Sequence, residues 1–429
     1  MADLRIAVRP SDFRFSPHLT MRFEEFFVRA GRFVADGVTL DEIARKYPTP
    51  LYIYSAAAIR AKYQLLEGSF PEFGICYSLK ANPNQAVSRV LSGLGAGAEV
   101  SSPRELATAL EAGFGPESIV YVAPAKTAAE VEQALRAGIH AIVADAASDL
   151  DLVESASRSL GVTARVLLRI NTRESQPEAK EVMVGGPSKF GFDEERLAAD
   201  IAGVRLRNAR IAGIQVYSAS QVLDKLWLAT HIEYSLDLAQ RSSRELGFKL
   251  ETIDFGGGFG VPQHERESEL DLAGLAAAVR RPIAWFRAEH PECRLLFESG
   301  RYLVAEAGVF VTRVIRVKES RGRFFAICDG GMNAFSRPVF MRIKHPVRLL
   351  NRLNDHASAH VDVCGPICTP LDCIARDARL PMPKAGDFVG LSNAGAYGYT
   401  MSLLDFMSRG RPVEILADAG NLADVTLRS

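Results

Sequence analysis

The stretch Tyr77-Ser78-Leu79-Lys80-Ala81-Asn82 is an apolar run with a single lysine near its end, and it stops at Asn82-Pro83-Asn84. Burying an ammonium without a partner is costly, and the usual escape is a lowered pKa. A lysine of that kind is a nucleophile that can form a Schiff base with a carbonyl. The alternative is an ordinary solvated lysine at the end of a strand, so the neighbouring segments must decide between the two.

The composition is that of a globular protein. The chain has 429 residues, of which 48% are apolar and 24% charged, enough for two domains with their own cores. It carries 51 basic and 51 acidic residues, so neither nucleic acid nor an anionic membrane surface is predicted as a partner. No apolar run is long enough to span a membrane, and the first residues do not resemble a signal peptide. We therefore expect a cytoplasmic protein with a small ligand.

Three of the six cysteines lie close together in the sequence, at Cys364, Cys368 and Cys373. Their spacing matches none of the usual zinc-binding pairs, and no histidine follows them. The sequence therefore predicts no metal site.

Short β-rich segments alternate with segments of helical periodicity through the middle of the chain. The predicted strands are 74–81, 97–101, 118–123, 141–145, 164–171, 211–218, 250–256 and 294–299. Helical segments such as 103–112, 128–137 and 223–246 separate them. Eight strands that alternate with helices are typical of a (β/α)8 barrel.

After Glu306 the pattern changes to strands that are separated by turns. The predicted strands are 309–317, 324–328, 359–363, 387–392 and 412–415. This pattern indicates a β-sandwich or β-barrel domain. We therefore expect a barrel at 51–306 and a β-domain at 307–429, with the N-terminal segment 1–50 joined to the β-domain.

Polar side chains stand at the ends of several predicted strands. In a (β/α)8 barrel the active site lies at the carboxyl ends of the strands. The candidates at these ends are Lys80, Glu99, Ser101, Arg169, Asn171, Tyr217, Ser218, Ser220, Gln221, Glu298 and Arg301. Because these ends meet at one mouth of a barrel, we expect the side chains to lie close together.

The glycine triplet Gly256-Gly257-Gly258 directly follows the seventh predicted strand. Glycines there let backbone N–H groups approach a phosphate, although a simple tight turn is the alternative. Arg301, one strand later, can pair with a phosphate through two hydrogen bonds. Glu298 offers the carboxylate that keeps a pyridine nitrogen protonated. Together with Lys80, these groups predict pyridoxal 5′-phosphate as the cofactor.

The sequence resembles the fold-type III pyridoxal-phosphate decarboxylases, the family of diaminopimelate, ornithine and arginine decarboxylases. The resemblance extends from Pro50 to Leu416, and its motifs occur in the family's order. They are Tyr77–Asn82, Gly97–Ser102, Lys189–Phe192, Gly256–Gly260, Glu298–Arg301, Gly365–Cys368 and Gly395–Gly398. It implies a barrel with a β-domain and a homodimer whose active sites lie at the subunit interface.

The resemblance also implies roles for individual residues. It makes Lys80 the Schiff-base lysine and Glu298 the partner of the pyridine nitrogen. It makes Cys368 a residue lent by the other subunit to protonate the product carbanion, although a free cysteine is often only a small buried hydrophobe. The phosphate ligands would be Ser220, Gly258, Arg301 and Tyr397, and the remaining cofactor contacts Glu99, Arg169, Tyr217, Gly256, Gly257 and Gly300.

Two positions depart from the family pattern. Tyr217 stands where relatives usually have a histidine stacked on the cofactor, and an aromatic ring can still stack there. Thr369 follows Cys368 where an acidic residue commonly recognises the distal amino group of a diamino substrate. Because a hydroxyl cannot neutralise a buried ammonium, lysine, ornithine and diaminopimelate become doubtful substrates.

Arg337 lies in a stretch that resembles the diaminopimelate enzyme, in which an arginine binds the distal carboxylate; an ordinary surface arginine is the alternative. The combination of Gly185–Pro187, Gln215–Tyr217 and Cys368–Pro370 resembles a subgroup in specialised biosynthesis. Its members decarboxylate aminoacyl groups on carrier proteins or amino-acid units of siderophore precursors.

We therefore expect a decarboxylase of a carrier-bound or conjugated amino acid. A diaminopimelate-type enzyme for a free amino acid is the alternative within the family. A racemase, a cofactor-carrier protein and a catalytically dead regulator are the rivals outside this activity, but the presence of both Lys80 and Cys368 argues against the regulator.

Overall fold

The computed structural model describes residues 28–29, 32–173, 181–182, 185–263 and 267–426. Residues 1–27, which we assigned to the β-domain from the sequence, lie outside this part. The chain divides into two compact units. The barrel unit consists of Tyr63–Val261 and Leu270–Tyr302, and the sheet unit of the described residues up to Lys62, within Pro262–Glu269 and from Leu303 onward.

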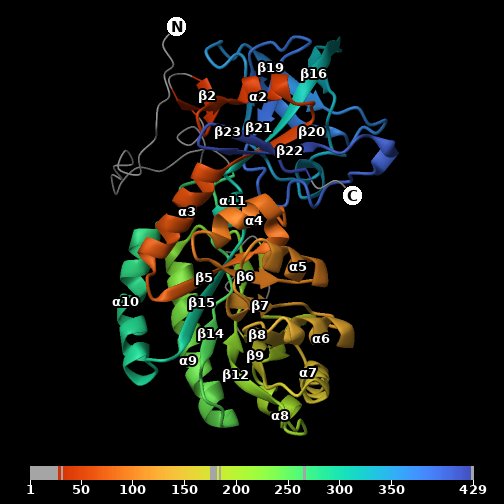
Figure 1. Cartoon of the computed structure of the whole chain (residues 1–429). Helices are drawn as coiled ribbons and strands as arrows, with labels where there is room; N and C mark the ends of the chain where they lie inside the picture. The colour runs from red at the N-terminus through yellow and green to blue at the C-terminus, as the bar shows by residue number, and fades with distance from the viewer. Residues whose placement is uncertain (1–27, 30–31, 174–180, 183–184, 264–266, 427–429) are drawn as a thin grey trace. The chain divides into compact units, whose positions relative to one another are not determined.

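The barrel unit is a closed ring of parallel strands with helices around it, as predicted (Figure 1). The strands follow one another in chain order, and β8 pairs with β9 to complete the ring. They are β5 (Phe73–Ser78), β6 (Gly97–Val100), β7 (Ile119–Tyr121), β8 (Ala141–Ala144), β9 (Ala164–Asn171), β12 (Ala209–Gln215), β14 (Thr252–Asp254) and β15 (Arg294–Ser299). Each of these strands overlaps a segment that the sequence predicts as a strand.

Helices connect successive strands on the outside of the ring. They are α4 (Gln85–Ser92), α5 (Pro103–Glu111), α6 (Ala128–Arg136), α7 (Ala147–Leu160), α8 (Leu197–Ile201), α9 (Lys225–Leu246) and α10 (Leu272–Glu289). Helix α3 (Ala56–Ser69), which begins in the sheet unit, precedes β5, and α11 (Arg301–Val304) follows β15. Side chains on their N-caps fix where several of them begin. Ser102 caps α5, for example, by accepting a hydrogen bond from the backbone N–H of Glu105.

The first barrel strand ends earlier than the sequence predicts. β5 stops at Ser78, and Leu79–Ala81 forms a 3₁₀ turn that carries Lys80. The Tyr77 hydroxyl donates a hydrogen bond to the carbonyl of Asn82, which closes this turn. Lys80 therefore projects from a fixed turn at the carboxyl end of the strand.

The sheet unit is a mixed, mainly antiparallel sheet around its own apolar core. Its strands include β16 (Gly308–Ser320), β17 (Arg323–Cys328), β18 (Val347–Leu349), β19 (Ala359–Cys364), β20 (Cys373–Leu380), β21 (Phe388–Leu391), β22 (Val413–Asp418) and β23 (Asn421–Asp424). The N-terminal elements β1 (Val28–Arg29), β2 (Arg32–Ala35), β3 (Val38–Thr39) and α2 (Leu40–Lys46) belong to the same unit. Leu40 and Ile43 of α2 join Val309, Val311 and Ile415 in that core.

Strand β4 (Leu51–Ser55) also belongs to the sheet unit, between β16 and β22. The sequence analysis predicted no strand here and assigned these residues to the barrel. Every residue of β4 is buried, so the segment lacks the alternation of apolar and polar residues that marks a half-exposed strand.

No helix within the described residues is both long and apolar enough to cross a membrane. The same part of the chain contains no group of three or more His, Cys, Asp and Glu side chains that could hold a metal ion. Cys364 and Cys373 are free cysteines that lie opposite each other in the register of β19 and β20.

A buried histidine lies at the amino end of the barrel strands. His140, just before β8, is 5% exposed and lies 3.0 Å from the Thr252 hydroxyl through Nε2. Arg294 donates to its Nδ1 across 3.2 Å. Burial, followed by the charges of Arg294 and Arg165, lowers the pKa of His140 to about 4. The fold therefore holds this imidazole neutral.

We expect His140 to make the protein less stable in acid. Below pH 6.5 this side chain is protonated in the unfolded chain, whereas in the folded chain it stays neutral down to about pH 4. The free energy of unfolding therefore falls as the pH is lowered from 6.5 to 4. The effect should be on the order of 3 kcal/mol. Urea unfolding at pH 7 and pH 4 should show a smaller loss in His140→Gln than in the wild type; equal losses would contradict the assignment.

Candidate active site

Lys80 lies at the carboxyl end of the barrel, beside a buried carboxylate. Its Nζ is 2.9 Å from Oε2 of Glu99, whose side chain is fully buried at the end of β6. Ser101 donates a hydrogen bond to the other oxygen of Glu99 across 2.8 Å. The ring of Tyr217, after β12, has its centroid 6.0 Å from the same Nζ. The lysine side chain is 39% exposed, so its amine is accessible from the mouth of the barrel.

Two more carboxyl groups lie at the ends of the neighbouring strands. Glu298 on β15 is 4% exposed and accepts a hydrogen bond from the Gln215 side chain across 2.7 Å. Asp254 on β14 is completely buried. Burial and then the charge of Glu298 raise the pKa of Asp254 well above its ordinary value. Burial also raises the pKa of Glu298, but the hydrogen bond with Asp254 opposes that rise, so Asp254 is the protonated partner and donates a hydrogen bond to the Glu298 carboxylate.

The glycine triplet Gly256–Gly258 turns between these strand ends. A methyl group at Gly257 would overlap the carbonyl oxygen of Glu298, so only glycine fits against the end of β15. The carbonyl of Gly258 accepts a hydrogen bond from the backbone N–H of Val222 across 2.8 Å, which ties the turn to the segment after β12. The turn is therefore packed against β15 and joined to the segment after β12.

Arg301 and Ser220 lie at the same edge. Arg301 begins helix α11, and its Nη2 is 3.5 Å from the Ser220 hydroxyl. A guanidinium, a hydroxyl and the N–H groups of a glycine turn are the donors that proteins use for phosphate.

Arg169 belongs to a different set of contacts. Its Nη1 is 3.7 Å from Oδ1 of Asp145, and its guanidinium lies 4.4 Å from the centre of the Phe190 ring. Asp145 also pairs with Lys126, whose side chain is fully buried. The described contacts thus place Arg169 against the Lys189–Phe192 motif.

The remaining predicted site residues lie in the sheet unit. Arg337, in α12 (Arg337–Phe340), is only 3% exposed, which excludes the surface arginine considered above. Its guanidinium carbon is 5.3 Å from the centre of the Tyr397 ring. Cys368 is exposed, with its Sγ 3.7 Å from Sδ of Met407, and Thr369 beside it is half-buried.

The contacts of the described residues therefore bring the predicted residues together in separate sets. Lys80, Glu99 and Tyr217 form one, Glu298 with the glycine triplet the next, and Ser220 with Arg301 a third. Gly300 is half-buried between Glu298 and Arg301. In the sheet unit, Arg337 and Tyr397 lie together.

The sequence analysis did not select Asp254 or Gln215, although both contribute to the carboxylate site. Asp254 ends a short apolar strand immediately before Phe255 and the glycine triplet, the same position that singled out Glu298 on the next strand. That signal was available for Asp254. For Gln215, only the fold shows that its side chain turns toward Glu298.

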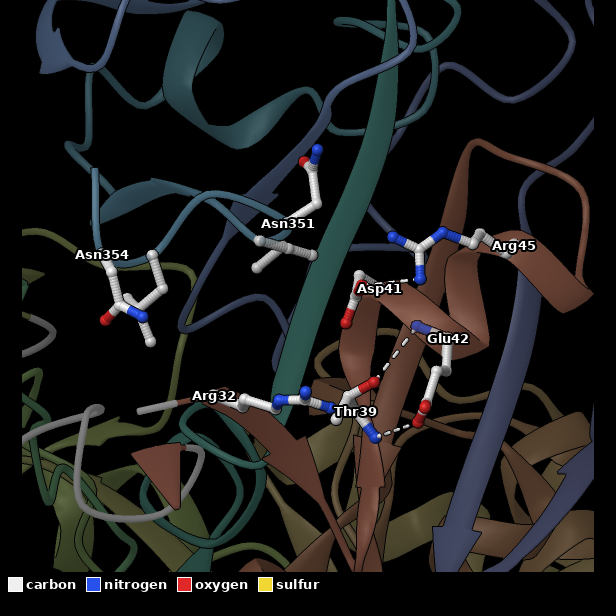
Figure 2. A pocket seen from close by; sticks show the side chains of 9 residues that line it. Arg32, Thr39, Asp41, Glu42, Arg45, Asn351 and Asn354 are labelled. Carbon is white, nitrogen blue, oxygen red and sulfur yellow. Dashed lines mark hydrogen bonds and ion pairs between the residues drawn. The ribbon is translucent and has the colours of Figure 1, made fainter. Parts of the chain in front are cut away.

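A separate polar cleft of about 360 Å³ opens in the sheet unit (Figure 2). Thr39 and Glu42 form a reciprocal cap on α2 there, and Asp41 pairs with Arg45 across 2.8 Å. Its lining contains none of the predicted site residues. It consists of Arg32, Thr39, Asp41, Glu42, Arg45, Leu350, Asn351, Leu353 and Asn354.

Comparison with known families gives a match over most of the barrel. Residues 56–305 match the model described as "Pyridoxal-dependent decarboxylase, pyridoxal binding domain". The chain belongs to this family.

Relatives of this pyridoxal-dependent decarboxylase include enzymes with different substrates. It is 35% identical over 396 residues to the L-glutamyl-[BtrI acyl-carrier protein] decarboxylase of Niallia circulans, covering 90% of this chain and 92% of that one. It is 31% identical over 415 residues to the diaminopimelate decarboxylase of Aquifex aeolicus, covering 95% and 94%. A solved structure of the diaminopimelate decarboxylase from Helicobacter pylori with L-lysine superposes with a TM-score of 0.81 at 28% identity, covering 90% and 95%.

The donor set of this decarboxylase fits pyridoxal phosphate. Of the three buried carboxyl groups, Glu99 pairs with Lys80 and Asp254 keeps its proton, and a protonated pyridine would supply the positive charge that the Glu298 carboxylate favours. Lys80 would hold the aldehyde carbon, Glu298 the ring nitrogen, and the glycine turn with Arg301 the phosphate.

We expect Gly257→Ala to impair cofactor binding in this decarboxylase. The added methyl group would push the glycine turn away from β15, so affinity for pyridoxal phosphate should fall by at least about ten-fold. Absorbance titration of the cofactor-free protein measures this. Gly203→Ala is the matched control because a Cβ there meets nothing within 4 Å; equal affinities in the two variants would contradict the close approach.

Proposed function

We propose that this enzyme decarboxylates an amino-acid unit attached to a larger carrier, such as an aminoacyl group on a carrier protein. The observation that carries the proposal is Thr369, which stands directly after Cys368 where a diamino substrate would need a carboxylate. The proposal rests on the family membership and adds the substrate class to it.

The contacts around Thr369 support this proposal. Its hydroxyl accepts a hydrogen bond from the backbone N–H of Leu371 across 3.3 Å. Asp372 is the acidic residue of the same loop, but its oxygens already accept from the backbone N–H groups of Met332 and Ile367, each across 2.7 Å. Thr369 and Asp372 of this loop therefore both accept hydrogen bonds from backbone N–H groups. The described part of the loop has no other carboxylate that could pair with a distal ammonium.

The relatives support the same direction. The 35% identical protein from Niallia circulans is described as acting on a glutamyl group of an acyl-carrier protein. Arg337, buried beside Tyr397, is a cation suited to an anionic or polar portion of such a conjugate. A large conjugate also gains binding energy from contacts away from the reacting bond.

In the proposed mechanism, pyridoxal phosphate supplies the electron sink for the bond to the departing carboxylate. Lys80, whose Nζ lies 2.9 Å from Oε2 of Glu99, would hold the cofactor through its amine. Glu298, accepting hydrogen bonds from Gln215 and Asp254, keeps a negative charge at the ring nitrogen. Tyr217 would cover one face of the cofactor, and the Cys368 thiol would supply the proton that replaces carbon dioxide.

We also propose that Cys368 acts across a two-fold dimer. The sheet unit carries exposed apolar side chains near the predicted residues: Met407 contacts Cys368, and Met401 contacts Arg337. Other large apolar side chains of this unit that are more than a third exposed are Ile315, Phe340, Met341, Leu371, Leu403 and Phe406. An apolar surface of this kind is typical of a subunit interface.

A free diamino acid remains the second candidate, because several relatives are diaminopimelate decarboxylases. Its distal carboxylate would pair with Arg337, but its distal ammonium would meet Thr369.

We expect free lysine, ornithine, arginine and diaminopimelate to be poor substrates. Leaving one charge of a buried pair without its partner costs ~3–5 kcal/mol, which corresponds to at least about a hundred-fold in kcat/KM. Mass spectrometry should detect loss of carbon dioxide from a carrier-tethered glutamyl group at a far higher kcat/KM. Efficient turnover of a free diamino acid by the wild type would refute the proposal.

Thr369→Glu supplies the matched variant for that comparison. The new carboxylate can meet a distal ammonium, so turnover of the diamino acids should rise relative to the carrier-tethered substrate. A parallel fall for every substrate would show instead that the substitution disrupts the loop.

Subunit mixing tests the shared site. Lys80→Ala and Cys368→Ala should each be nearly inactive as homodimers. In a two-fold dimer that contains one of each, one of the two sites receives both native residues, so the mixture should regain activity. Subunit exchange is verified beforehand with differently tagged chains. Inactive hybrids would place both residues in the site of one chain or remove Cys368 from the chemistry.

A further inference from the structure

Tyr217 rests on the backbone of the glycine turn. A Cβ built on Gly256 would lie 2.6 Å from Cδ2 of Tyr217 and 2.9 Å from its Cβ, and the φ of Gly256 is +62°. The turn therefore fits against the Tyr217 ring only because this residue is glycine. Nζ of Lys80 lies 6.0 Å from the centre of the same ring.

A histidine on helix α9 bonds to both sides of this contact. Nδ1 of His231 lies 3.1 Å from the hydroxyl of Ser218, the residue after Tyr217. Nε2 of His231 lies 2.9 Å from the carbonyl oxygen of Phe255, the residue before Gly256. One imidazole therefore joins the backbone segment that carries the tyrosine to the segment on which the tyrosine rests.

The partners determine the tautomer of His231. A carbonyl oxygen can only accept, so Nε2 carries the hydrogen and Nδ1 accepts from the Ser218 hydroxyl. Burial lowers the pKa of His231 from its ordinary value, which keeps the ring neutral. The two bonds therefore operate together, with one donated and one accepted.

Helix α9 holds the imidazole in place. His231 is 8% exposed, and Trp227, one turn earlier, stacks on it with the ring centres 5.7 Å apart and the planes at 21°. The position of the ring is thus fixed by helix packing and does not depend on a ligand.

We propose that His231 is a positioning residue, which acts through Tyr217 to hold the ring that covers the cofactor at the mouth of the barrel. The inference rests on the proposed function, because it takes Tyr217 to be a cofactor contact. It assigns to α9, on the outside of the barrel, a part in cofactor binding that the mouth residues alone do not show.

The rival explanation is that His231 only stabilises the fold. A purely structural histidine would change the unfolding midpoint without changing cofactor affinity in a way that depends on Tyr217. The chain offers a matched control in His140, which is also buried and joined to two other segments, but at the amino end of the strands.

The test measures the Kd of pyridoxal phosphate by absorbance titration of the cofactor-free proteins, so no substrate is needed. His231→Leu removes both bonds and should raise the Kd at least about ten-fold, or about 1.4 kcal/mol. His231→Gln can still donate toward Phe255 and should recover part of that loss. His140→Leu should lower the unfolding midpoint and leave the Kd within about two-fold of the wild type.

A double-mutant cycle shows whether the effect passes through the tyrosine. Tyr217→Ala should raise the Kd by itself, and adding His231→Leu to it should change the Kd little further. Additive losses, or a His231→Leu variant with the Kd of His140→Leu, would overturn the positioning role. If Tyr217→Ala binds as the wild type does, the tyrosine is no cofactor contact and the inference fails with it.

The same measurements separate this inference from the substrate proposal. A wild type that binds pyridoxal phosphate but decarboxylates only free diamino acids would refute the proposed substrate and leave the role of His231 intact. A wild type without affinity for pyridoxal phosphate would overturn both.

Discussion

The buried carboxyl groups at the mouth of the barrel constrain everything around them. Glu99, Asp254 and Glu298 come from three strands, and each is 4% exposed or less. Such a cluster is stable only if protons, hydrogen bonds or positive charges compensate it. Lys80 supplies one charge and Asp254 retains one proton. The same need to compensate buried negative charge favours a ligand with a cationic ring, such as a protonated pyridine.

Much of this arrangement could be predicted from the sequence, because it depends on local patterns. Apolar runs bounded by turn residues marked the barrel strands, and the closure of a parallel sheet then determined which ends share a mouth. Lys80, Glu298 and the glycine triplet could therefore be grouped before any coordinates were known. Strand β4 was not predicted because a strand that is buried on both faces lacks the alternation of apolar and polar residues by which strands are recognised.

Side chains that contact the site only through tertiary packing were harder to predict. Nothing in the spacing of His231 on α9 indicates that it reaches both Ser218 and Phe255, since those contacts exist only after the helix packs on the barrel. The burial of Arg337 likewise accompanies contacts with Tyr397 and Met401, which are about 60 residues away in the sequence. Local sequence thus predicts which chemistry gathers at a barrel mouth more readily than it predicts what orients that chemistry.

Strand β4 also has a consequence for how the protein is made. It pairs with β16 and β22, and the whole barrel lies between β4 and these partners in the sequence. On the ribosome, β4 emerges long before β16 and β22. This strand, which is fully buried in the folded protein, therefore stays unpaired while the barrel is synthesised. The barrel can form first from its sequential strands, whereas the sheet unit assembles only near the end of translation. Until then, Leu51–Ser55 has neither of the neighbouring strands with which it pairs in the folded sheet.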